Sequence, residues 1–264
     1  MSGTRIAAIR LPCVDLDATE AFYVEAFGCV RETRETARRV IRLGNQRIEL
    51  VLASGAPAAP APSNATGFQH CAIIVADMDA AMARLRQSHV WSPISRNGPE
   101  QLPQASGGAT AFKFRDPDGH PLELLQFAPG QVPEIWQAQG GAVFRGVDHS
   151  AITVSQTDEA IAFYRGLGFD PSERHLNRGV EQARLDGLAL EEALVEVTTL
   201  RPAGGAPPHL ELLCYRDPPG LSAPAPDGSV LATVLRLEGV PARDGDAPRA
   251  LRDPDGHRLD IAEA

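Results

Sequence analysis

The sequence predicts an α+β fold of four strand–helix–strands modules arranged in two pairs. The main observation is a six-residue segment, RDPDGH at 115–120, which recurs letter for letter at 252–257 in the second half of the chain. Each copy precedes a strand-like run, at 121–127 and 258–262. Because Asp-Pro-Asp-Gly favours a tight turn, both halves are expected to end in the same hairpin.

Each module is expected to open with a strand followed by a helix, and this plan is visible three times. In the first module, Asp17 is expected to cap the helix, with Glu20 in a capping-box arrangement and Gly28 just past the helix end. The pair Phe22-Tyr23 recurs at the same helical position as Phe163-Tyr164. Short alternating strand patterns follow the helices. The three strand–helix segments are 6–27, 68–85 and 147–167.

The fourth module is degenerate and is expected to lack its helix. Residues 230–237 suit a first strand, but 238–247 form a segment too short and too rich in Pro and Gly for a helix, so a loop is expected there. A connector at 129–142 separates the halves. We therefore predict one domain of modules one and two over residues 1–128, and another of modules three and four over 143–264.

Composition indicates an acidic, soluble, cytoplasmic protein. A chain of 264 residues is comfortable for two domains, and 43% hydrophobic residues exclude wholesale disorder. The net charge of −9 argues against a nucleic-acid partner. No apolar run is long enough to span a membrane, and no secretory signal is expected at the N-terminus. The four cysteines lack paired spacing, which is typical of core residues in a reducing compartment.

The modules resemble the vicinal oxygen chelate superfamily, which includes glyoxalase I, extradiol dioxygenases and bleomycin-binding proteins. The resemblance rests on the four-module plan, on the Phe-Tyr pair of the helix, and on the closing Asp-Pro-x-Gly-x-x-x-Glu from Asp116 to Glu123. It covers nearly the whole chain and is specific for the fold rather than the reaction. It implies βαβββ modules, paired so that curved mixed sheets form cups. It also implies a divalent metal held by the first and fourth strands of each module.

Aligning the modules on their helices gives eight candidate ligand positions. Three of the fourth-strand positions are Glu residues between apolar neighbours, and period-two alternation turns each carboxylate away from those neighbours. A buried, unpaired carboxylate costs several kcal/mol, which a metal or water would offset. A single such Glu also suits a solvent-facing strand, so the recurrence strengthens the metal interpretation. The first-strand positions are Ala8, His70, His149 and Ala232, and the fourth-strand positions are Glu49, Glu123, Glu211 and Asp260.

Pairing of the modules decides which candidates share a cup. If the modules of one half pair, both cups are incomplete, with Glu49, His70 and Glu123 in one and His149, Glu211 and Asp260 in the other. If module two pairs with three and module one with four, one cup receives His70, Glu123, His149 and Glu211. The other then receives Ala8, Glu49, Ala232 and Asp260. We favour this crossed arrangement, with one live and one vestigial site.

The crossed ligand set suits one divalent metal ion, such as Zn, Ni, Co, Mn or Fe. Such an ion would polarise a carbonyl and stabilise an enediolate, while Glu123 or Glu211 acts as the base. The pattern is similar to that of glyoxalase I. It favours a metal-dependent lyase or isomerase acting on a small oxygenated substrate.

Two other functions stay open. His70, His149 and Glu123 alone would satisfy an Fe(II) site of an extradiol-type dioxygenase, although Lys113 stands where that family usually carries Tyr. A metal-free protein that binds an antibiotic or another small molecule is the third interpretation. His120 and His257 are interpreted as turn or surface residues. A monomer or a homodimer is compatible with four modules in one chain.

Overall fold

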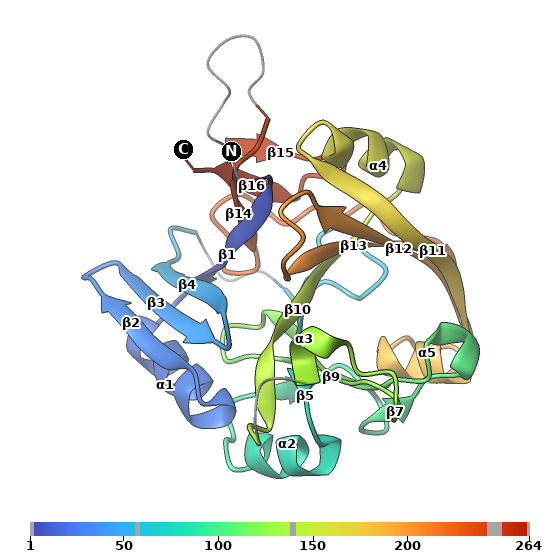
Figure 1. Ribbon diagram of the computed structural model, residues 1–264, viewed down its shortest axis with the longest axis horizontal. Helices are drawn as coiled ribbons and strands as arrows, with labels where there is room; N and C mark the ends of the chain where they lie inside the picture. The colour runs from blue at the N-terminus through green and yellow to red at the C-terminus, as the bar shows by residue number, and fades with distance from the viewer. Residues whose placement is uncertain (1–2, 56–58, 138–140, 242–249, 263–264) are drawn as a thin grey trace.

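Two mixed sheets dominate the computed structural model, which describes residues 3–55, 59–137, 141–241 and 250–262 (Figure 1). The seven strands of the small sheet run in the order β15 (Ala250–Arg252), β16 (Arg258–Ile261), β14 (Val234–Glu238), β1 (Arg5–Cys13), β4 (Gln46–Leu52), β3 (Arg38–Leu43) and β2 (Val30–Arg34). The large sheet runs in the order β11 (Phe169–Gly179), β12 (Ala193–Pro202), β13 (His209–Asp217), β10 (Phe144–Thr153), β5 (Gln69–Val75), β9 (Pro121–Gln126), β8 (Thr110–Arg115) and β6 (Ser92–Pro93). Strand β7 (Glu100–Gln101) also pairs with β8.

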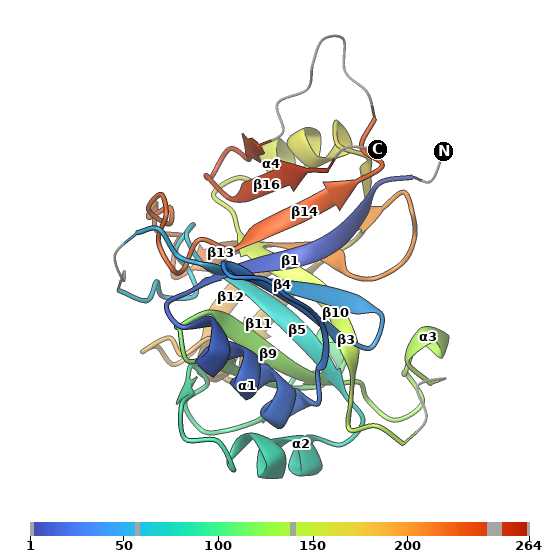
Figure 2. The same cartoon turned by 90° about the vertical axis from the view of Figure 1, so that its left-hand side faces the viewer.

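Each sheet combines modules from both halves of the sequence. The small sheet joins modules one and four through the antiparallel pair β1–β14, which lies side by side in Figure 2. The large sheet joins modules two and three through the antiparallel pair β5–β10. The crossed pairing expected from the ligand sorting is therefore what the strand order shows. The domain boundaries at 1–128 and 143–264 stay a prediction.

The helices begin and end where local capping is available. Helix α1 (Leu16–Phe27) is capped by Asp15, whose carboxylate accepts from two backbone N–H groups, and it ends at Gly28 with φ 74°. Asp17 lies inside the first turn, so the expected cap was wrong by two residues. Helix α2 (Met78–Leu85) is capped by Asp77, whose side chain accepts from the backbone N–H of Ala80. The remaining helices are α3 (Glu134–Gln137), α4 (Thr157–Arg165), α5 (Val180–Leu185) and the 3-10 turn η1 (Gln104–Ser106).

The repeated RDPDGH segment fastens one module to another. In the first copy, Asp116 accepts a hydrogen bond of 3.0 Å from the hydroxyl of Tyr23 in α1. Asp118 accepts from the backbone N–H of Val14 at 2.8 Å. The His120 Nε2 donates to the carbonyl of Pro12 at 2.7 Å. The turn that closes module two thus holds the strand–helix junction of module one.

The second copy makes the same contacts in the other half. Asp253 accepts from the Tyr164 hydroxyl at 3.1 Å, and Asp255 accepts from the Ser155 N–H at 2.9 Å. His257 Nε2 lies 2.9 Å from the carbonyl oxygen of Thr153. Both motif histidines directly follow the turn and are buried, so of the two interpretations, turn or surface residues, the surface one was wrong. The repeat explains the Phe-Tyr pair as well, because its tyrosine is the donor to the repeated Asp.

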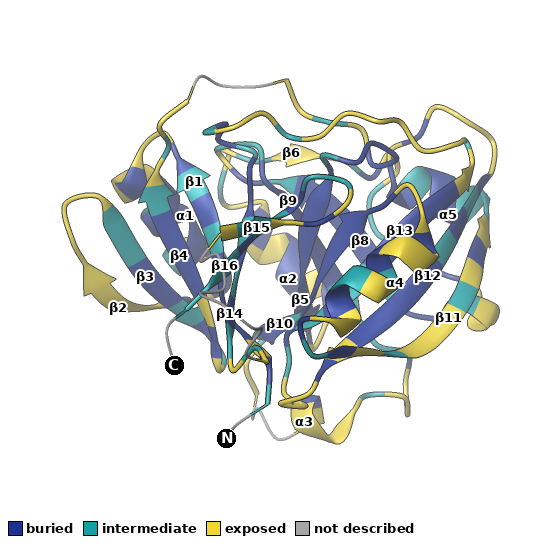
Figure 3. Ribbon diagram, turned by 90° about the horizontal axis from the view of Figure 1, so that it is seen from above, coloured by how far each residue is buried: buried dark blue, intermediate teal, exposed yellow. Residues whose placement is uncertain are grey.

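Burial follows the sheets, as Figure 3 shows. The inner strands β5, β9, β8 and β13 are mostly buried, whereas the edge strand β2 is exposed along its whole length. In module four, the described residues between β14 and β15 contain no helix, and the rest of that expected loop, 242–249, lies outside the described residues. None of the described helices is long and apolar enough to cross a membrane.

Candidate metal centre

The four residues expected in the live site lie on the four central strands of the large sheet. The backbone register relates them by an approximate two-fold axis. Glu123 lies opposite Ala72, two residues beyond His70, and Glu211 lies opposite Ala151, two residues beyond His149. The strands β5 and β10 then bring His70 opposite Ala151 and His149 opposite Ala72. Two imidazole–carboxylate pairs consequently face one another across the β5–β10 junction.

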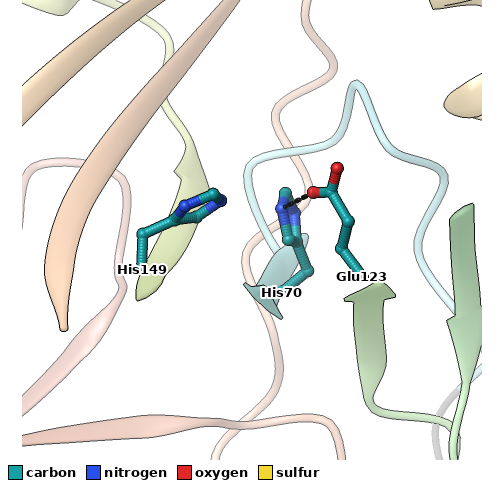
Figure 4. A group of neighbouring side chains, drawn as sticks. All are labelled: His70, Glu123 and His149. Atoms are coloured by element: carbon teal, nitrogen blue, oxygen red, sulfur yellow. Dashed lines mark ion pairs between the residues drawn. The ribbon is translucent and has the colours of Figure 1, made fainter. Parts of the chain in front are cut away.

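Three of the four side chains form a tight group. The ligand atoms of His70, Glu123 and His149 all lie within 4.8 Å of one another, and all three residues are buried. His70 Nε2 lies 2.7 Å from Glu123 Oε2, and the two imidazole rings are 5.7 Å apart between centroids. Figure 4 shows the three side chains pointing toward a common space.

Glu211 lies beside this group rather than in it. Its Oε2 is 3.6 Å from His149 Nε2, and its side chain is 20% exposed compared with 7% for that of Glu123. Its Oε1 is 3.5 Å from Nε2 of His209. The two carboxylates, equivalent in register, therefore have different surroundings.

Two polar residues of the site were not expected from the sequence. Asp148 Oδ2 accepts from His149 Nδ1 at 3.1 Å, and His209 completes a second close group with these two residues. His209 lies two residues before Glu211, so strand alternation could have placed it on the same face. Asp148 is adjacent to a ligand candidate and should face away from it. An irregularity of the β5–β10 pairing between Val147 and His149 removes that alternation.

The pKa values follow from burial and neighbouring charge. Burial would raise the pKa of Glu123, but the positive charge of Lys113 and the contacts with the two histidines hold it at about 2. Burial would lower the pKa of His149, but the carboxylates of Glu211 and Asp148 raise it to about 9. Burial and the charge of Lys113 lower the pKa of His70. Without a metal, the site therefore balances its carboxylates partly with a proton on His149.

The residues fit a divalent metal. Among the described residues, Nδ1 of His70 has no hydrogen-bond partner, and Nε2 has only the 2.7 Å contact with Glu123. A buried polar atom without a partner costs about 1–3 kcal/mol, which coordination would offset. Two imidazoles and one or two carboxylates suit Zn, Ni, Co, Mn or Fe.

A cavity of about 590 Å³ opens over the group. Its wall combines polar and apolar side chains, and among the charged residues Lys113 has its ammonium 2.7 Å from Asp186 Oδ1. A volume in this range suits a small organic molecule. The apolar part of the lining includes Leu102, Leu125, Leu185, Val197 and Leu213.

Comparison with known proteins identifies the family. Residues 5–124 match the sequence model of the Glyoxalase/Bleomycin resistance protein/Dioxygenase superfamily. Over 125 residues, 45% of this chain and 92% of the relative, the chain is 31% identical to "Uncharacterized protein YaeR" of Escherichia coli (strain K12). The chain belongs to the glyoxalase/bleomycin resistance/dioxygenase superfamily.

Solved structures of this superfamily share the whole fold. Glyoxalase I from Zea mays is 17% identical, with a TM-score of 0.62 over 98% of this chain and 92% of that one. A candidate dioxygenase from Bacillus subtilis subsp. subtilis str. 168 is 15% identical, with a TM-score of 0.55 over 98% of this chain and 85% of that one. At these identities the likeness shows the fold alone.

The small sheet of this superfamily member repeats the same register without histidines. Arg10 lies opposite Glu49, and Arg236 lies opposite Asp260, as Ala72 and Ala151 lie opposite their glutamates in the large sheet. The equivalent of His149 is therefore Val234. The assignment of Ala232 was wrong, because Ala232 precedes β14 and the missing helix left no anchor for the alignment.

Arginines surround the carboxylates of the small sheet. Glu49, with its side chain only 4% exposed, accepts from Arg10 Nε at 3.0 Å, Arg38 Nη2 at 2.8 Å and Arg236 Nη1 at 2.7 Å. Arg10 also contacts Asp260. These guanidinium groups hold the pKa of Glu49 below its usual range despite burial. Positive side chains thus take the place that a metal would need in the cup of the small sheet.

Proposed function

We propose that the cup of the large sheet is the active site of a divalent-metal-dependent, glyoxalase-like lyase or isomerase acting on a small oxygenated substrate. The observation that carries the proposal is a buried group of two histidines and a carboxylate, beside a second carboxylate that stands apart from it. His70, Glu123 and His149 would hold the metal. When bound, the metal would polarise a substrate carbonyl and stabilise enediolate-type negative charge.

The different surroundings of the two glutamates assign their roles. Glu123 is almost fully buried, lies 2.7 Å from His70 Nε2 and pairs across the strands with Lys113, so it is held in place. Glu211 is more exposed and contacts His209 outside the tight group. The neighbouring histidines, above all His149, lower the pKa of Glu211, so its carboxylate is ionised. Glu211 is therefore the base that moves a proton between neighbouring substrate carbons.

Metal content and two isosteric variants test this function. We expect about one equivalent of divalent metal in protein purified without chelator, and its loss in H70A/H149A. E211Q should keep the metal but lose at least about 100-fold in turnover, because only the base is removed. E123Q should lose metal affinity. Turnover is measured by NMR as deuterium exchange next to the carbonyl in a panel of 2-oxoaldehydes, hemithioacetals and 2-hydroxy ketones.

The results separate the alternatives. Retention of full exchange activity in E211Q would contradict the assignment of the base. Iron in the purified protein, with oxygen uptake on catechols, would favour the dioxygenase. That candidate is supported by the tight group alone, which is already a two-histidine, one-carboxylate set. No metal even after reconstitution would leave a metal-free small-molecule-binding protein.

A further inference from the structure

The connector between the two halves reaches the candidate metal centre. Trp136 lies in the short helix α3 and is 2% exposed, and its ring lines the cavity. Its Nε1 donates a hydrogen bond of 3.0 Å to Asp148 Oδ1. We propose that Trp136 is a positioning residue of the metal centre, acting on His149 through Asp148. This inference rests on the proposed function of the cup.

Asp148 connects the indole to the imidazoles. While Oδ1 accepts from Trp136, Oδ2 accepts from His149 Nδ1 at 3.1 Å and lies 3.8 Å from His209 Nδ1. A hydrogen bond at Nδ1 fixes the orientation of the His149 ring. Nε2 is then the atom directed toward the other ligands. Outer hydrogen-bond partners of metal-bound histidines commonly fix the ring in this way. Trp136 holds the carboxylate that sets this orientation.

The backbone under Trp136 is shaped to receive the indole. At Gly146 the β5–β10 pairing is irregular, and a Cβ on this residue would lie 2.7 Å from Trp136 Cζ3. Arg145 Nη1 donates to the Trp136 carbonyl at 2.6 Å, which ties α3 to the same strand. Gly146 thus leaves room for the indole, and Arg145 fixes the backbone of Trp136. An orienting hydrogen bond requires such a fixed donor.

The second histidine lacks such support. His70 has no hydrogen-bond partner at Nδ1 among the described residues. Gln69, which stands in the position of Asp148 one residue before the histidine, donates instead to Ser150 Oγ at 3.0 Å. The Trp136–Asp148 pair therefore belongs to one half of the two-fold arrangement only. Trp136 lies in the connector, whereas Asp148 lies in the first strand of module three.

The two tryptophans of the chain provide a matched test. W136F keeps an aromatic ring in the cavity wall and removes the N–H donor. W91F removes the other indole, which donates to the carbonyls of Leu85 and Ser88 at 2.9 and 3.0 Å and packs on Phe112 and Phe114. We expect W136F to raise the Kd for Co²⁺ about tenfold and to alter the visible absorption of the bound Co²⁺, because outer partners tune both. W91F should leave both unchanged.

Fluorescence gives a readout that does not depend on turnover. In W91F the single tryptophan is Trp136, so Co²⁺ should quench its emission in step with binding. In W136F the remaining Trp91 should not respond. If W136F fails to fold, as judged by its thermal unfolding, D148N replaces it. In D148N the amide oxygen still accepts from Trp136, while the nitrogen in place of Oδ2 cannot accept from His149, so the loss of affinity should be at least as large.

Equal Kd values and identical Co²⁺ spectra in W136F, W91F and the unmodified protein would overturn the positioning role while leaving the proposed function intact. Absence of Co²⁺ binding in the unmodified protein would overturn both.

Discussion

At the scale of the residue, His149 is the group through which metal binding is linked to pH. Its pKa is raised to about 9 by Glu211 and Asp148, so in the metal-free protein it carries a proton at pH 7.5. The pKa of His70 is lowered, so His70 is neutral there. A metal must displace the proton of His149. We therefore predict release of about one proton per metal bound at pH 7.5, and an apparent affinity that falls about tenfold per pH unit below pH 9.

Calorimetric titration with Zn²⁺ in buffers of different ionisation enthalpy measures this proton release. The prediction gives both the direction and the size of the effect, because the affinity for Zn²⁺ must increase as the pH rises toward 9. Binding that releases no proton at pH 7.5 would show that His149 is already neutral in the metal-free protein. D148N removes one of the carboxylates that raise the pKa of His149, and it should release fewer protons than the unmodified protein.

At the scale of the element, each copy of the RDPDGH turn stabilises the contact between two neighbouring modules. Y23F and Y164F each remove the hydroxyl that donates to a buried Asp side chain of the turn. Each should lower the free energy of unfolding by about 1–3 kcal/mol, because an acceptor loses its donor away from water. The losses should add in the double variant, since the two turns share no partner. Urea denaturation measures them, and an unchanged midpoint in either variant would show that the tyrosine hydrogen bond does not stabilise its turn.

Much of the arrangement of elements could be predicted from the sequence, because repeats and alternation report it directly. His70, Glu123 and His149 follow from strand position within a module. The rest depended on geometry that no local pattern carries. Asp148 reaches the site because of an irregular strand pairing. Trp136 reaches it from a connector whose path is set by tertiary packing. The place of Val234 could not be found because its module has lost the helix that aligns the other three.

At the scale of the whole molecule, the crossed sheets give the protein two related cups. Different interactions stabilise the two cups. In the large sheet the ligand candidates come from both halves, with β5 and β9 in module two and β10 in module three. A metal there would join the halves. In the small sheet, the carboxylates of β4 and β16 are joined to β1 and β14 by arginine side chains. Metal-dependent and metal-independent stabilisation should therefore be separable by mutation.

Thermal unfolding of the unmodified protein and three variants tests this separation. Zn²⁺ at about 100 times its Kd should stabilise the unmodified protein by about 2.7 kcal/mol and H70A/H149A by nothing. Without metal, the free energy of unfolding of E49Q should be lower by about 3 kcal/mol, because three guanidinium groups lose the carboxylate that they contact. Zn²⁺ should nevertheless stabilise E49Q by the same increment as the unmodified protein. The variant E35Q, which loses one surface contact with Arg38, is the matched control and its stability should change little.

The stability difference should also depend on pH. Because the pKa of Glu49 in the folded protein is lowered, the loss of stability in E49Q should shrink as the pH falls below 4.5. A smaller Zn²⁺ increment in E49Q would mean that the small sheet also holds metal, contrary to the division of the two cups.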